Sequence, residues 1–182
     1  IFFYNGTGDF LKVFEHFGLP VSLFKPTGKN SIESVIPYFP INYNTLFVHN
    51  TFSSIGDIEL ISTHSKNSYF CFCPNANRYI ENRLPGFSRF KSFSDRICLG
   101  TDSLASNHQL SILEEMKTIQ QHDASVSTSE LLKWATLNGA TFFGWNKELG
   151  SIEPGKMPGL NLISQVSDDL QLTVDSAIQK LV

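Results

Sequence analysis

Three short apolar runs separated by helical stretches constrain the fold of this 182-residue chain more than any other feature. The runs are residues 45–48, 69–73 and 96–99, and each is apolar on both of its faces. Strands of this kind are typical of a parallel sheet that helices cover on both sides. A weaker run at residues 20–24 is interpreted as a fourth strand. The pattern therefore predicts an α/β fold built from βαβ units.

The number of strands is too small for a closed fold. A parallel barrel has about eight strands, and an open three-stranded parallel sheet leaves long unpaired edges. We therefore expect the remaining strands to come from elsewhere. The chain also begins at Ile1 rather than Met, which indicates a piece of a longer or processed polypeptide.

Composition excludes several classes of protein. Acidic residues number 17 and basic ones 14, so the net charge of −3 lacks the positive field that a nucleic-acid binder needs. No apolar run approaches the roughly 20 residues of a membrane span. Three cysteines, an odd number, and no leader segment indicate free thiols in a reducing compartment, so we expect a cytoplasmic location.

Helical spacing of apolar residues predicts the connecting elements. Phe10, Val13, Phe14 and Phe17 form one such stripe, which Gly18 ends. Further helices are predicted from Ser31 to before Pro37, over residues 57–64, and around Ile112, Leu113, Met116 and Ile119. Another begins at Ser127, where Glu130 completes a capping box, and is expected to bury Leu131, Leu132 and Ala135.

The last part of the chain differs in composition. From Gly150 onward glycine and proline are frequent, and residues 160–163 have the pattern of a strand. We therefore expect one domain at residues 1–149 and a separate C-terminal segment at residues 150–182.

Two polar side chains follow apolar runs at their carboxyl ends, His49 and Asp102. Parallel α/β folds bind ligands at this edge of the sheet. Imidazole nitrogen and carboxylate oxygen suit zinc, or could activate a water molecule. The alternatives are a hydrogen-bonded packing role for the histidine and a helix-capping role for the aspartate. Asn75 and Asn77, on the loop after the second run, could face a substrate or form a turn.

Cys71 and Cys73 lie two residues apart, so on a strand their thiols share one face. A soft metal could bind such a pair, but no second pair or adjacent histidine supports it. Buried small apolar side chains are the better interpretation.

Five ordered segments resemble the second half of the amidohydrolase superfamily, in the branch of guanine, cytosine and adenosylhomocysteine deaminases and related chlorohydrolases. They are LFVHN at 46–50, CPNAN at 73–77, LGTDS with ASN at 99–107, WATLNGA at 134–140 and GSIEPGKMPGLNL at 150–162. The family's last segment more often ends in Ala-Asp-Leu, so Asn161 is a minor departure.

The resemblance implies part of a TIM-type (β/α)8 barrel, roughly strands 6 to 8, followed by a short β segment of a small β-domain. It also implies a metal-dependent hydrolase of C–N bonds, a deaminase of a small purine- or pyrimidine-like ring. Asp102 matches the family's metal-binding aspartate that accepts a proton from the attacking water. His49 matches the histidine that binds the metal or hydrogen-bonds the water.

The departures from the family pattern concern the metal site. The family's His-x-His pair is absent, as are its fifth-strand histidine and proton-shuttling glutamate, and Phe72 stands where many relatives have a polar residue. One carboxylate and one imidazole make an incomplete zinc-type site. We therefore expect this chain alone to be inactive and to hold little metal, and the N-terminal half of the barrel to come from a longer chain or a partner.

Two other classes compete with the enzyme. A half-barrel could serve as a non-catalytic binding or assembly module, and the polar pair at 49 and 102 argues against it. A Rossmann-like nucleotide binder would need a Gly-x-Gly-x-x-Gly turn, which the chain lacks. The sequence leaves open whether identical chains associate.

Overall fold

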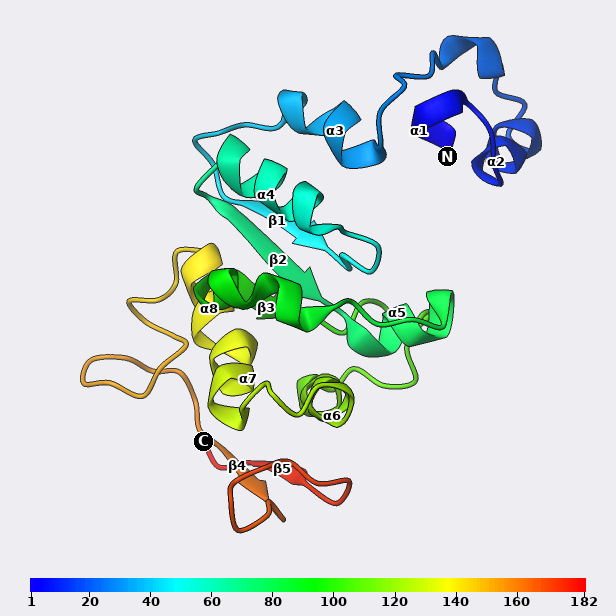
Figure 1. Cartoon of the computed structure of the whole chain (residues 1–182). Coiled ribbons are helices and arrows are strands. Elements are labelled where there is room, and N and C mark those ends of the chain that lie inside the picture. The colour runs from blue at the N-terminus through cyan, green and yellow to red at the C-terminus, as the bar shows by residue number, and fades with distance from the viewer. The chain divides into compact units, whose positions relative to one another are not determined.

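The computed structural model describes residues 1–182, and for Leu23 only the backbone. It separates two compact units, one of Ile1–Tyr43 with Ser54–Asn67 and one of Asn44–Ser53 with Ser68–Val182. The elements along the chain (Figure 1) are α1 (Phe2–Asn5), α2 (Phe10–His16), η1 (Val21–Leu23), α3 (Ser31–Val35), η2 (Ile36–Tyr38), β1 (Thr45–Val48), α4 (Ile55–His64), β2 (Ser68–Phe72), α5 (Pro74–Glu81), η3 (Phe87–Arg96), β3 (Ile97–Leu99), α6 (Ile112–His122), α7 (Thr128–Ala135), α8 (Leu137–Phe142), β4 (Asn161–Ser164) and β5 (Ala177–Lys180).

The second unit contains a parallel sheet in the order β1-β2-β3, with β2 in the centre (Figure 1). Thr45 pairs with Ser68, and Phe70 pairs with Ile97. The predicted α/β fold with a parallel sheet is confirmed, and the three predicted strands lie within a residue of their expected bounds. Their numbering as strands 6 to 8 of a barrel stays a prediction.

The central strand is buried on both faces, as its apolar run predicts. Phe70 and Phe72 are fully buried, and their rings contact Phe90 of η3 at centroid distances of 5.0 Å. Trp134 of α7 also contacts Phe72, at 6.2 Å. Aromatic contacts therefore fix η3 and α7 against one face of β2.

The cysteines lie on the opposite face of the sheet. Cys71, Cys73 and Cys98 are buried and pack with Tyr69 and Ala76. Burial raises the pKa of the Cys98 thiol to about 11. A hydrogen bond with Cys71, together with burial, raises the pKa of Cys73 as well. The prediction that the cysteines are buried small apolar side chains is confirmed.

The predicted capping box of α7 is present, since Ser127 and Glu130 bond each other's backbone. The predicted buried face is partly wrong, because Leu132 is exposed and Trp134 is buried beside Leu131. Leu131 and Trp134 are three residues apart and so share one side of the helix, whereas Leu132 points elsewhere.

The predicted fourth strand is wrong, because Val21–Leu23 forms a short 3-10 helix. Phe24 stacks on Phe2 at 4.1 Å, and Phe2 also contacts Phe14 of α2 at 5.5 Å. The apolar run at residues 20–24 therefore contributes to an aromatic cluster among short helices. An isolated four- or five-residue strand would need a partner to pair with.

The strand predicted at 160–163 is confirmed as β4, which pairs antiparallel with β5. The domain boundary at Gly150 stays a prediction, since the two compact units divide the chain elsewhere. Among the described residues, every helix is too short or too polar to cross a lipid bilayer.

Candidate active site

The carboxyl ends of β1 and β3 bring His49 and Asp102 together. His49 Nε2 lies 3.9 Å from Asp102 Oδ2. Both strand ends are anchored on β2, because the His49 N–H donates to Cys71 O and the Gly100 N–H donates to Phe72 O, each at 2.9 Å. The parallel register thus carries two residues that are distant in sequence to one edge of the sheet.

Both residues have a strained backbone. The φ of His49 is +71° and that of Asp102 is +57°, in the left-handed region that side chains other than glycine rarely adopt. Strain of this kind is concentrated at functional sites, where the surrounding contacts maintain it.

Asn77 sets the tautomer of His49. Its Nδ2 donates to Thr51 Oγ1 and to His49 O, so its Oδ1 faces His49 Nδ1 at 2.9 Å. The imidazole must donate from Nδ1, because the amide oxygen only accepts. In the neutral ring the lone pair is therefore on Nε2, which faces Asp102, as in a metal-binding histidine.

Asp102 is held as a carboxylate by its own loop. Oδ2 accepts from Ser106 Oγ at 2.8 Å, and Oδ1 accepts from the Ser103 N–H at 2.7 Å. The Ser106 hydroxyl makes the largest contribution to lowering the pKa of Asp102, followed by the Ser103 N–H. The Asp102 side chain is therefore an ionised carboxylate at neutral pH.

Asn75 and Asn77 lie in the first turn of α5 and not on a loop, so that part of the prediction is wrong. Pro74 occupies the start of this helix, a position that proline favours because its missing N–H has no partner there anyway. The Asn75 amide bonds Glu115 and Thr118, at 3.1 and 2.7 Å. Both asparagine amides thus already have protein partners.

Glu115 of α6 is a site residue that sequence reasoning missed. Its side chain is 0% exposed, and burial raises its pKa while hydrogen bonds from Asn75 and Asn107 oppose that shift. A signal was present, because Glu115 stands between Ile112 and Ile119 on the apolar side of the predicted helix.

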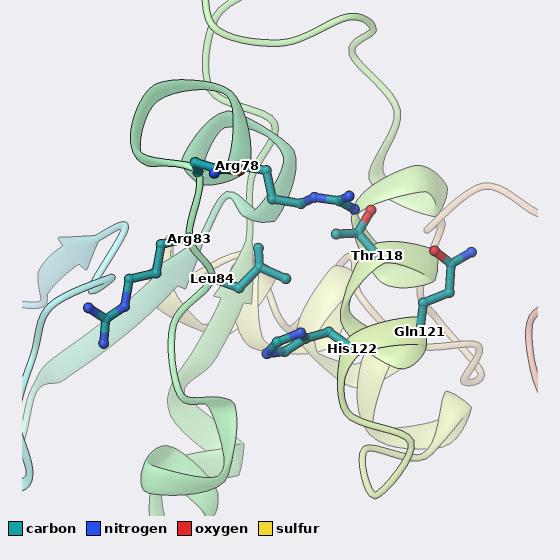
Figure 2. Close-up of a pocket in the computed structure, with 7 residues that line it drawn as sticks. Arg78, Arg83, Leu84, Thr118, Gln121 and His122 are labelled. Atoms are coloured by element: carbon teal, nitrogen blue, oxygen red, sulfur yellow. The ribbon is translucent and has the colours of Figure 1, made fainter.

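A pocket lies away from this pair, at the C-terminal ends of α5 and α6 (Figure 2). Figure 2 shows Arg78 extending toward Thr118, with His122 and Gln121 farther along α6. Neither His49 nor Asp102 lines it. His108 is exposed and contacts the ring of Tyr79 at 6.0 Å.

The donor atoms fit part of a zinc site. An imidazole nitrogen and a carboxylate oxygen 3.9 Å apart are within the roughly 4 Å that two ligands of one zinc ion can span. Across the described residues, no group of three or more His, Cys, Asp or Glu side chains could hold a metal. The pair supplies two ligands, and a complete site needs others.

Residues 28–181 match the model of the amidohydrolase family. The chain belongs to the amidohydrolase family. The match covers the sheet, the His49–Asp102 pair and the β4–β5 hairpin. Membership confirms the resemblance seen in the sequence motifs.

Proteins similar to the chain include several deaminases. An adenosine deaminase of Helicobacter pylori is 32% identical over 163 residues, which are 87% of this chain and 38% of that protein. The structure of Helicobacter pylori aminofutalosine deaminase in complex with methylthio-coformycin matches 87% of this chain and 38% of its own, with a TM-score of 0.68 and 26% identity.

An adenosine deaminase of Xanthomonas campestris with bound zinc has the same fold. It matches 84% of this chain and 39% of its own, with a TM-score of 0.66 and 22% identity. The chain therefore spans less than two fifths of the length of these relatives.

Proposed function

We propose that this chain supplies one side of the active site of a metal-dependent deaminase that acts on adenosine-like nucleosides. The observation that carries the proposal is the approach of His49 Nε2 to Asp102 Oδ2, at 3.9 Å. The similarity to deaminases supports the reaction class.

His49 and Asp102 would hold a divalent metal of the zinc type. Such an ion, when bound, supplies a water whose pKa is lowered toward neutrality. The role of His49 is to offer Nε2, and the hydrogen bond from its Nδ1 to Asn77 selects the tautomer of the neutral ring that has its lone pair on that nitrogen. Its ring orientation is fixed because Asn77 is itself buried.

Asp102 acts as the general base and then as the general acid. It takes a proton from the water that attacks the ring carbon bearing the exocyclic amine. It returns that proton to the leaving nitrogen, while the second proton of the water ends on the ring nitrogen next to that carbon, so the C–N bond breaks, ammonia departs and a carbonyl remains. Hydrogen bonds from Ser103 and Ser106 keep the carboxylate aimed and ionised before the reaction.

The remaining ligands would come from a half-barrel that carries the His-x-His pair, either in a longer polypeptide or in a partner chain. Under this proposal the three parallel strands are strands 6 to 8, and residues 1–182 alone are inactive and metal-poor. The edges of the sheet at β1 and β3 would then pair with the strands of the other half.

Direct substrate contact by Asn75 and Asn77 stays a prediction. Asn75 would have one amide hydrogen and one lone pair of Oδ1 to offer beside its bonds to Glu115 and Thr118, and Asn77 one lone pair of Oδ1 beside its bonds to Thr51 and His49.

The test is ammonia release from adenosine in the presence of Zn²⁺, measured for the chain alone and for the chain joined to a half-barrel with a His-x-His pair. The proposal predicts turnover and stoichiometric zinc for the joined protein only. Stoichiometric zinc on the separate chain, or a joined protein that folds, holds zinc and deaminates no nucleoside, contradicts it. The second result would favour a binding or assembly module.

A further inference from the structure

The carboxylate of Glu115 is buried with amide groups as its hydrogen-bond partners. Oε2 accepts from the Asn75 N–H at 2.8 Å, and Oε1 accepts from Asn75 Nδ2 at 3.1 Å and Asn107 Nδ2 at 2.8 Å. Burying a carboxylate is costly unless its lone pairs are satisfied. The three donors come from two different segments, the start of α5 and the loop after β3.

One of these contacts leads to Asp102. Asn107 Nδ2 also donates to Thr101 O at 2.8 Å, directly before Asp102 in the chain. The strained φ of Asp102 needs such contacts, because a loop without them would relax toward an ordinary conformation. Glu115 therefore fixes, through Asn107, the backbone that aims the Asp102 carboxylate.

The other contacts lead to His49. Asn75 is held at its backbone N–H and Nδ2 by Glu115, and its Oδ1 accepts from Thr118 Oγ1 at 2.7 Å. Asn75 and Asn77 share the first turn of α5. Glu115 therefore also fixes the turn from which Asn77 orients the imidazole.

We propose that Glu115 is a positioning residue that couples the loop carrying Asp102 to the first turn of α5, from which Asn77 orients His49. It touches neither of the two residues and acts through Asn107 on one side and Asn75 on the other. The coupling is a property of the fold, whereas its consequence for catalysis rests on the proposed deaminase function.

Glu114 provides a matched control. It lies next to Glu115 on α6, but it is partly exposed and pairs with Lys117 Nζ at 2.8 Å. Glu114→Gln changes the charge of the same helix by the same amount and touches neither the first turn of α5 nor the Asp102 loop. Glu115→Gln places an NH₂ group where a carboxylate oxygen accepted, so at least one of the three donors on Asn75 and Asn107 loses its acceptor.

The coupling is tested by amide hydrogen exchange, resolved by NMR, in the joined protein and in both variants. Glu115→Gln is expected to speed exchange about tenfold or more at Asn75 and Asn77 and at Ser103 and Ser106, and Glu114→Gln is expected to change none of them. Faster exchange in only one segment, or an equal increase over the whole of β1–β3, would overturn the coupling.

A variant of a single contact covers the case in which Glu115→Gln does not fold. Asn107→Ala removes the link to the Asp102 loop and leaves Glu115 bound to Asn75. Exchange should rise at Ser103 and Ser106 and stay within about twofold at Asn77. An equal rise at Asn77 would contradict the two-sided arrangement.

Steady-state kinetics then separate this inference from the proposed function. Glu115→Gln should lower kcat about tenfold or more with KM within about twofold, because only the reacting groups are displaced. Glu114→Gln should leave both unchanged. Faster exchange in the first turn of α5 and in the Asp102 loop, together with an unchanged kcat, would overturn the positioning role. If the joined protein without any substitution is inactive, the deaminase proposal is rejected, and the exchange data still decide the coupling.

Discussion

His49 Nδ1 lies 2.9 Å from Asn77 Oδ1, and this one hydrogen bond decides which imidazole nitrogen faces Asp102. The histidine directly follows β1, and the asparagine lies in the first turn of α5, the helix that follows the neighbouring strand β2. The parallel pairing of β1 with β2 is therefore what presents the lone pair of Nε2 at the edge of the sheet.

Replacement of Asn77 with Ala should weaken the fold as well as the site. Asn77 is 1% exposed, and its loss leaves His49 Nδ1 and Thr51 Oγ1 without this partner. The expected decrease in the free energy of unfolding is about 1–3 kcal/mol, measured by urea denaturation. The exposed Asn146 gives a control. Asn146→Ala should change the free energy of unfolding by no more than about 0.5 kcal/mol. Equal effects of the two substitutions would show that the Asn77 contacts contribute little.

The stability of the protein should depend on pH through Glu115. Burial raises the pKa of Glu115 in the folded state, so the folded chain binds this proton more tightly than the unfolded chain does. The stability of the parent protein relative to Glu115→Gln should then fall as pH rises from about 4 through the folded-state pKa, and level off above it.

Urea denaturation over a series of pH values measures this difference, with Glu114→Gln as the control for net charge. A difference that grows as pH rises through that range would mean that the hydrogen bonds from Asn75 and Asn107 outweigh burial. The pKa of Glu115 would then lie below its ordinary value.

Much of the site could be predicted because it depends on local patterns. An apolar run predicts a strand, and a polar residue at its end predicts a position at one edge of a parallel sheet, which is where His49 and Asp102 lie. Their approach to 3.9 Å then follows from a register that three neighbouring strands impose.

The parts that could not be predicted depend on tertiary partners. Trp134 rather than Leu132 is buried because Phe72 and Ser94 lie on that side of α7, with Ser94 Oγ accepting from Trp134 Nε1 at 3.0 Å. Glu115 was missed for the same reason. Its burial on an apolar side of the helix is explained only by the hydrogen bonds from Asn75 and Asn107, which lie outside that helix.

Gly150 occupies a position that alanine should not tolerate. Its φ is +88°, and an added Cβ would lie 2.8 Å from Ala140 Cβ and 2.9 Å from Leu137 Cα. Gly155 has the same φ, but no atom lies within 4 Å of an added Cβ. A substitution at Gly155 therefore measures the cost of the left-handed backbone alone, without a steric clash.

Gly155→Ala is expected to lower the free energy of unfolding by about 1–2 kcal/mol, and Gly150→Ala by about 1–3 kcal/mol more because of the clash. Thermal or urea denaturation measures both. Equal losses would show that the contact between Gly150 and α8 relaxes without cost.

The most direct test of the account is the turnover of adenosine by Asp102→Asn in the joined protein, followed as ammonia release with zinc content measured on the same samples. Asp95→Asn, at a carboxylate that is 72% exposed, is the control. We predict that Asp102→Asn stays folded, loses zinc or binds it more weakly, and turns over about 100-fold or more slowly, because the group that moves the proton is gone. A folded Asp102→Asn protein with the zinc content and turnover of the parent would contradict the assignment of the His49–Asp102 pair as the reacting centre.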